Sequence, residues 1–328
     1  MNEDEEVVID SGTSLLIETL ETRWKTYRNE LKRCQKEPSE EAIHDLRVVT
    51  RRLLALVDML RAVSPHPRFQ KMRRTFKDQL DNLDDLRDTQ VMLMEVSETV
   101  DVLPELTPFQ EYLTKREKRF LRSTAKEIKL FKSRGFRKRI DSTHKALLKK
   151  KGKGFQQEIL LQIVDDAYEA ALRRYRRIEP TQPGTIHRLR IAFKKFRYMV
   201  EIVHPLVPDF PEDNFEHMHA YQGMMGDIQD LEILLAAFQD FADNDTSYNL
   251  EPVHQFYQQR HTEVVNAFIK GMHQINTFWR PKAESDYPWQ TKQRRKKSGI
   301  TKKTSEPLPE EDKGGNREQA EAEQEAQK

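Results

Sequence analysis

One histidine and three arginines share a predicted helix in the first part of the chain, within the phrase IHDLRVVTRRLLALV of residues 43–57. Counted from the histidine, the arginines stand at positions +3, +7 and +8, so the four residues are His44, Arg47, Arg51 and Arg52. At 3.6 residues per turn, the first three fall on one face of a helix. Arginine presents a planar fork of donors that suits phosphate oxygens, and an imidazole can donate an N–H as well. This face therefore has the chemistry to bind an anion with repeated negative charge.

The same arrangement occurs a second time, in the phrase IHRLRIAFKKFRYMV of residues 186–200. There the positions of the four basic residues, 143 places further along the chain, are taken by His187, Arg190, Lys194 and Lys195. A second pair of similar phrases, DDLRDTQVML from Asp84 and GDIQDLEILL from Gly226, follows in the same order at a shift of 142. Two pairs at nearly one shift indicate a duplicated chain with two related halves.

Each basic stripe is predicted to face away from the apolar side of its own helix. An ordinary solvated helix face is the simpler interpretation of a single stripe. Core residues have drifted between the two copies, as from Leu53 to Phe196. The positive charge persists, as from Arg51 to Lys194. We therefore interpret the two stripes as an anion-binding site, and we expect their basic residues not to be buried within their own half.

Two such helices facing each other would form a positive groove between the halves, and opposed low-dielectric walls would concentrate its field. Nucleic acid is the obvious polyanion, but proteins that bind single strands interleave aromatic residues with cations so that bases stack. Tyr198 is the only aromatic residue on either stripe, and its counterpart is Ala55. A bare phosphate chain therefore fits better. A nucleic-acid-binding protein that uses the basic stripes together with the charged C-terminal tail stays the less favoured alternative.

Further basic clusters occur in the third predicted helix and after Phe131, and they could line the same surface. Each cluster alone is more typical of a solvated helix face. Together they indicate that the cations are clustered along the chain. As candidate additional anion contacts we name Arg73, Arg74, Arg134, Lys138 and Tyr198.

Catalysis has less support in the sequence. The chain has no Gly-rich phosphate loop and no H-E-x-x-H motif. A set of helix-spaced carboxylates could hold Mg²⁺, but capping of helices and orientation of the arginines explain these residues more simply; they are Asp84, Asp85, Asp88, Asp227 and Asp230. The cations around His44 and His187 would repel a metal ion. We therefore expect no catalytic residue, metal or cofactor, and a Mg-dependent phosphohydrolase acting on phosphate chains stays an alternative.

Composition excludes several classes of protein. The chain has 328 residues, of which 37% are hydrophobic and 34% charged, and its 56 basic and 54 acidic residues give a net charge of +2. Net charge therefore predicts no partner.

The single cysteine, Cys34, excludes an intrachain disulfide and any zinc site built on a cysteine pair. No apolar run approaches the roughly 20 residues that span a membrane, and the acidic start lacks the order of a secretory signal. We expect a soluble cytoplasmic protein without a membrane partner.

Apolar residues recur at helical spacing almost everywhere, and no alternating β-branched run favours a strand. We therefore predict an all-α fold. Ser39 and Thr185 are predicted N-caps, because their hydroxyls can bond free backbone N–H groups of a first helical turn. The expected helices are 13–36, 40–62, 68–82, 84–100, 108–130, 134–150, 155–178, 185–203, 213–240 and 251–279.

The duplication predicts two helix bundles side by side, the first over 13–150 and the second over 155–279. Four helices per half is a natural size for such a bundle. The polar ends, residues 1–12 and 280–328, have too little apolar surface to offset the entropy of the chain, so we expect both to be disordered.

The doubled histidine phrases and the two downstream phrases resemble the signature of the CHAD family, the conserved histidine α-helical domain. The resemblance covers roughly residues 13–279. It implies two four-helix bundles related by a pseudo-twofold axis, with a basic groove between them. It also implies non-catalytic binding of inorganic polyphosphate and recruitment to polyphosphate granules. No E-x-E-x-K motif of an accompanying CYTH triphosphatase domain is present, so we expect a stand-alone CHAD protein.

By motif match, the resemblance assigns polyphosphate binding to both histidine phrases. The residues concerned are His44, Arg47, Arg51, Arg52, His187, Arg190, Lys194 and Lys195. Lysine replaces arginine at two signature positions of the second copy. This keeps the charge but loses the bidentate fork, so the affinity of the second copy is expected to be lower.

Overall fold

The computed structural model describes residues 11–131, 134–149, 157–244 and 251–290. All regular elements in these ranges are helices, which confirms the predicted all-α fold. The α-helices are α1 Ser11–Lys36, α2 Glu40–Val63, α3 Pro67–Thr99, α4 Thr107–Leu130, α5 Arg134–Leu148, α6 Gln157–Tyr175, α7 Pro183–Val203, α8 Asn214–Asn244 and α9 Glu251–Gly271. Short 3₁₀ helices follow at η1 Pro104–Leu106, η2 His204–Leu206 and η3 Met272–Thr277.

Several helix boundaries depart from the sequence prediction. Helix α1 begins at Ser11, so the disorder expected for residues 1–12 is wrong for residues 11 and 12, and α9 ends at Gly271, before the expected residue 279. Residues 68–82 and 84–100 form one helix, α3, because the buried positions Leu80, Leu83 and Leu86 continue the helical period across the expected break. Ser39 caps α2 as predicted, since its Oγ accepts a hydrogen bond from the Ala42 N–H at 3.2 Å.

The prediction for Thr185 was wrong, because α7 begins at Pro183. The Thr185 hydroxyl donates to the carbonyl of Gln182 at 2.7 Å, while the backbone N–H of Glu179 donates to that hydroxyl at 3.1 Å. Thr185 thus holds the turn that leads into α7, and the fixed φ of proline starts the helix.

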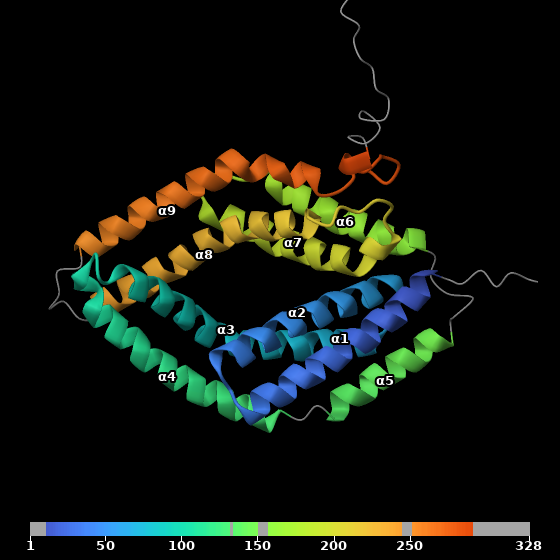
Figure 1. Cartoon of the computed structure of the whole chain (residues 1–328), viewed down its shortest axis with the longest axis horizontal. Helices are drawn as coiled ribbons and strands as arrows, with labels where there is room; N and C mark the ends of the chain where they lie inside the picture. Colours follow the sequence, from blue (N-terminus) through green and yellow to red (C-terminus); the bar gives the residue numbers. More distant parts are fainter. Residues whose placement is uncertain (1–10, 132–133, 150–156, 245–250, 291–328) are drawn as a thin grey trace, which may run out of the picture.

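The helices form two groups that lie one above the other (Figure 1). Helices α1–α5 make up the first group, and α6–α9 make up the second. The groups meet where α2 packs on α6 and α7, and again where α3 packs on α8. Helix α5 packs on α1 and α3 as a fifth member of the first group, so a pair of matching four-helix bundles is not confirmed.

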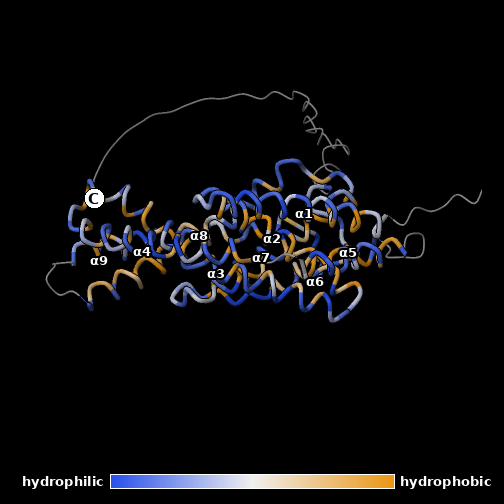
Figure 2. The backbone as a smooth tube through the Cα atoms, turned by 90° about the horizontal axis from the view of Figure 1, so that it is seen from below, coloured by the Kyte–Doolittle hydropathy of each residue, from blue (hydrophilic) through white to orange (hydrophobic). Residues whose placement is uncertain are grey.

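Hydrophobic and hydrophilic residues mix along every labelled helix (Figure 2), as amphipathic helices require. The larger hydrophobic core runs through both groups and contains Leu53 of α2 and Phe196 of α7. A second core joins the far ends of the groups, where Phe109 of α4 meets Phe238 of α8 with ring centroids 5.3 Å apart. Shared cores hold the two groups in one arrangement, which fixes how α2 and α7 face each other.

The ordered chain extends beyond the predicted boundary at residue 279. Arg280 donates to Asp165 of α6 at 2.7 Å, and Trp289 is only 9% exposed. Tyr287 and Trp289 stack with centroids 4.8 Å apart, so aromatic packing orders residues 280–290, which their polar neighbours concealed in the sequence. The predictions of disorder for residues 1–10 and 291–328 lie outside the described residues.

Candidate functional site

Helices α2 and α7, which carry the two histidine phrases, pack against each other. This packing brings together four basic residues, two from each phrase, which we call the cation cluster: Arg47, Arg51, Arg190 and Lys194. Arg51 lies within electrostatic reach of Arg190, and Lys194 lies within reach of Arg47. These two pairs exchange with each other under the 143-residue shift, so the cluster follows the duplication of the chain.

The positive charges in the cation cluster act on one another. The pKa of Lys194 is lowered to about 6, first because the ammonium is buried and then because Arg51 and Arg190 are close. Burial, followed by the charge of Arg47, lowers the pKa of Arg51 to about 10. The Lys194 ammonium therefore loses its proton more readily than an ordinary lysine, and a negative charge nearby would raise its pKa again.

Arg47 is the one member of the cluster that is fully buried, with 4% exposure. Its Nη1 donates to Oδ1 of Asp84 at 2.6 Å and to the Leu80 carbonyl at 3.3 Å, both on α3. The expectation that the stripe is not buried in its own half is wrong for Arg47. Helical periodicity describes the two faces of one helix alone. Arg47 can be buried because a carboxylate on the next helix supplies the counter-charge that a buried guanidinium requires.

Arg190, the counterpart of Arg47, lies against α8 where Gly226 takes the place of Asp84. A Cβ atom at Gly226 would lie 3.9 Å from both Nε and Nη2 of Arg190. The Nε atom is buried and has no hydrogen-bond partner among the described residues. Burial raises the pKa of Asp230 on α8, and the charge of Arg190 opposes that rise. Arg190 therefore keeps unused donor capacity at the cluster.

The two histidines differ in their surroundings. His44 is exposed, and partial desolvation followed by the nearby guanidinium of Arg87 on α3 lowers its pKa. His187 is half-buried near Glu232 of α8, and its Nδ1 has no hydrogen-bond partner among the described residues.

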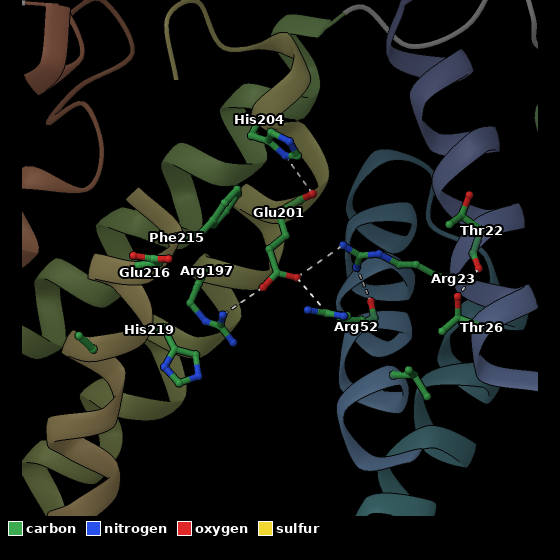
Figure 3. Close-up of a pocket in the computed structure, with 12 residues that line it drawn as sticks. Thr22, Arg23, Thr26, Arg52, Arg197, Glu201, His204, Phe215, Glu216 and His219 are labelled. Carbon is green, nitrogen blue, oxygen red and sulfur yellow. Dashed lines mark hydrogen bonds and ion pairs between the residues drawn. The ribbon is translucent and has the colours of Figure 1, made fainter. Parts of the chain in front are cut away.

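The last residue of each stripe lies away from the cation cluster. Arg52 points into a pocket between the two groups, where its Nε is 3.3 Å from Oε2 of Glu201 (Figure 3). Lys195 is exposed. Both stand at position +8 from their histidine, and one further residue turns the side chain by about 100° from that of Arg51 or Lys194.

The candidate additional contacts separate in space. Tyr198 is buried, lies near Arg51, and its ring carries the guanidinium of Arg197 at 4.6 Å from the centroid. Arg73 is held by Asp58 at 3.0 Å. Arg74 is exposed on α3, and Lys138 is exposed on α5 in a basic depression beside Arg68. The side chain of Arg134 lies outside the described residues.

The carboxylates surround the cluster on α3 and α8. Burial raises the pKa of Asp88, and Asp84 and Asp230 contribute to the rise while Arg47 opposes it. Asp84 orients Arg47, as the simpler sequence interpretation proposed. Within the described ranges, no group of three or more His, Cys, Asp or Glu residues is arranged to hold a metal ion.

Sequence reasoning missed two residues that extend the row of charges along α7. Arg190, Lys194, Arg197 and Glu201 follow one another at helical spacing, and Arg197 contributes to the low pKa of Lys194. Arg197 was overlooked because its counterpart in the first copy is Leu54. The available signal was the +7 spacing between Arg190 and Arg197, which places both on one helix face.

Comparisons with known proteins agree on one family. A family model described as CHAD domain matches residues 18–239. The crystal structure of the CHAD domain from the plant Ricinus communis is similar, with a TM-score of 0.61 and 19% sequence identity, covering 80% of this chain and 91% of that chain. At this identity the likeness concerns the fold alone. A comparison with curated protein sequences finds no match. None of the described helices has the length and apolar character needed to cross a membrane.

Proposed function

The chain belongs to the CHAD family, and from that premise we propose that it binds inorganic polyphosphate at the cation cluster without catalysing its breakdown. The observation that carries this proposal is the packing of α2 on α7, which brings Arg47 and Arg51 of one half within electrostatic reach of Arg190 and Lys194 of the other. Like charges that are partly buried together cost folding free energy, and a bound polyanion would offset that cost.

A ligand with repeated charge suits the cluster better than a single anion. Arg51 and Lys194 lie at the centre, and Arg47 and Arg190 each stand one helical turn away on their own helix, about 5–6 Å along it. A chain of linked phosphates is long enough to contact Arg51 and Lys194 at the centre and to reach Arg190 one turn away. The Nε of Arg190 has no hydrogen-bond partner among the described residues, so this guanidinium keeps donor capacity for a ligand.

Nucleic acid is a weaker candidate for this site. Tyr198, the aromatic residue of the stripes, is only 7% exposed and its ring already faces Arg197. Because a buried ring offers no open face for base stacking, affinity for a single strand would rest on its phosphates alone. We therefore propose that the site prefers a plain phosphate chain. Localisation in the cytoplasm at polyphosphate granules remains part of the proposal.

A competition titration tests the proposal. Fluorescently labelled long-chain polyphosphate is bound by the full-length protein and displaced with unlabelled polyphosphate, single-stranded RNA or single-stranded DNA at equal phosphate concentration. We expect polyphosphate to displace the label at least about tenfold more effectively than either nucleic acid. Equal displacement would refute selectivity for the phosphate chain. The same protein incubated with polyphosphate and Mg²⁺ should release no phosphate, and release above a protein-free control would favour the phosphohydrolase alternative.

A further inference from the structure

A pocket of about 700 Å³ opens between the two groups of helices (Figure 3). None of the four residues of the cation cluster lines it, although Arg197 in its wall lies within electrostatic reach of Lys194. Its walls come from α1 and α2 on one side and from α7, η2 and the start of α8 on the other. Pockets for small organic ligands have volumes of about 300–1,000 Å³ and frequently lie between structural units. The size and position of this pocket are therefore those of a small-molecule site.

One end of the pocket is strongly cationic. Three guanidinium groups converge on the single carboxylate of Glu201, with ion-pair distances of 3.1 Å for Arg197, 3.3 Å for Arg52 and 3.9 Å for Arg23. The side chains of Arg23 and Arg197 are only 12% and 10% exposed, so water solvates them poorly. Burial and the charge of Arg52 lower the pKa of Arg23 to about 10, although Glu201 opposes this. Glu216, exposed on α8, is a second carboxylate in the lining, so the three guanidinium groups outnumber the two acids of the pocket.

The other end of the pocket is aromatic and apolar. Phe215 lies at the wall, and the ring of His204 meets it edge-on with centroids 5.2 Å apart. Ala220 and the exposed imidazole of His219 continue this wall along α8, and Val49 lines the pocket from α2. Flat rings bind well against such surfaces through edge or offset stacking. An inorganic phosphate chain would leave this wall without a partner.

We propose that this pocket binds a nucleoside phosphate, with its phosphates at Arg23, Arg52 and Arg197 and its base against Phe215 and His204. In the free protein the carboxylate of Glu201 binds the guanidinium groups that would bind a phosphate of the ligand, so the two groups would compete. The ligand combines a flat ring with a compact anion, and this pocket presents one surface for each. The proposal does not depend on polyphosphate binding, because Arg51 belongs to the cation cluster whereas Arg52 points into the pocket.

Isothermal titration of the full-length protein with ADP, inorganic pyrophosphate and adenosine tests the proposal. We expect ADP to bind at a ratio of one, with a Kd at least about tenfold below that of pyrophosphate, and adenosine to bind more weakly than ADP. Phe215→Leu should weaken ADP binding at least about fivefold and leave pyrophosphate and long-chain polyphosphate unaffected. Phe256→Leu on α9, an exposed ring outside the pocket, is the matched control and should change none of these affinities.

A second variant keeps the test decisive if Phe215→Leu fails to fold. Glu201→Gln keeps the shape of the side chain but removes the competing charge, so ADP should bind at least about threefold more tightly. The proposal is overturned if ADP does not bind, if ADP binds no tighter than pyrophosphate, or if Glu201→Gln leaves its affinity unchanged. Arg51→Ala combined with Lys194→Met should abolish polyphosphate binding and retain ADP binding, so failure of the proposed function is recognised separately.

Discussion

The guanidinium of Arg47 donates to the carboxylate of Asp84 at 2.6 Å, whereas its counterpart Arg190 faces Gly226 at the equivalent place on α8. The duplicated halves therefore differ in how they hold the same arginine. In the first half the cation is buried and paired, and it ties α2 to α3. In the second half the Nε of Arg190 has no hydrogen-bond partner among the described residues. We infer that Arg190 is the more available of the two to a phosphate.

Placing an acid at the second position tests this difference. Gly226→Asp would give Arg190 the partner that Arg47 already has, and the Cβ atom fits at 3.9 Å from the guanidinium. We expect polyphosphate affinity to fall about tenfold, because the new carboxylate competes for Arg190. Gly226→Ala is the control, and a calorimetric titration should find its affinity unchanged. Equal losses in both variants would mean that the backbone, and not the charge of Arg190, matters.

Removing the acid from the first position should mainly affect stability. Asp84→Asn leaves the guanidinium of Arg47 buried without its counter-charge, so we expect the free energy of unfolding to fall by about 1–3 kcal/mol. Urea denaturation of wild type and variant measures this loss. Asp85→Asn, at a neighbouring exposed position, is the control and should change stability by less than about 0.5 kcal/mol. A wild-type midpoint for Asp84→Asn would show that the pair contributes nothing.

Lys194 should be unfavourable for the stability of the free protein. Its folded pKa of about 6 lies below the unfolded value, so the unfolded state binds more protons between about pH 6 and 10.5. Stability therefore rises with pH across this window, and the cost of Lys194 is largest at its acidic end. We expect Lys194→Met to raise the free energy of unfolding at pH 7 by about 1–3 kcal/mol. Denaturation at pH 7 and pH 10 checks this, and a gain that does not shrink at pH 10 would contradict it.

Polyphosphate binding should take up a proton. An anion beside Lys194 raises its pKa, so the affinity is expected to fall as the pH increases from about 6 towards 10. Titrations in two buffers with different ionisation enthalpies measure the proton uptake, which should be close to one near pH 8. Lys194→Arg keeps the cation charged and should bind with a flatter pH dependence. Wild-type affinity that does not change over this range would contradict a role for Lys194.

The fold class followed from the sequence because helical periodicity and scarce glycine are local signals. Helix continuity was harder to predict: the polar phrase around Asp84 suggested a break within α3, although buried Leu83 and Leu86 continue through it. The ordering of residues 280–290 was missed for a similar reason. Trp289 gains its partners from segments far away in the chain, including the carbonyl of Pro208, to which its Nε1 donates at 3.3 Å.

The cation cluster was partly predictable, since duplication marks positions that both halves retain. The burial of Arg47 was not, because it depends on how α3 packs beside α2. The pocket around Glu201 was also missed, because its three arginines come from α1, α2 and α7 and only Arg52 stands at a basic position that both phrases share. Repetition reveals the features that the two halves share, and it does not reveal those that form where unlike segments meet.

The most direct test of polyphosphate binding at the cation cluster compares wild type with Arg51→Ala/Arg190→Ala/Lys194→Met over a range of salt concentrations. We expect the triple variant to keep its helical circular dichroism and to lose at least about a hundredfold in affinity at low salt. The slope of log K against log salt should become shallower by about two or more, because fewer counterions are released. A triple variant that binds polyphosphate with wild-type affinity and slope would contradict the account.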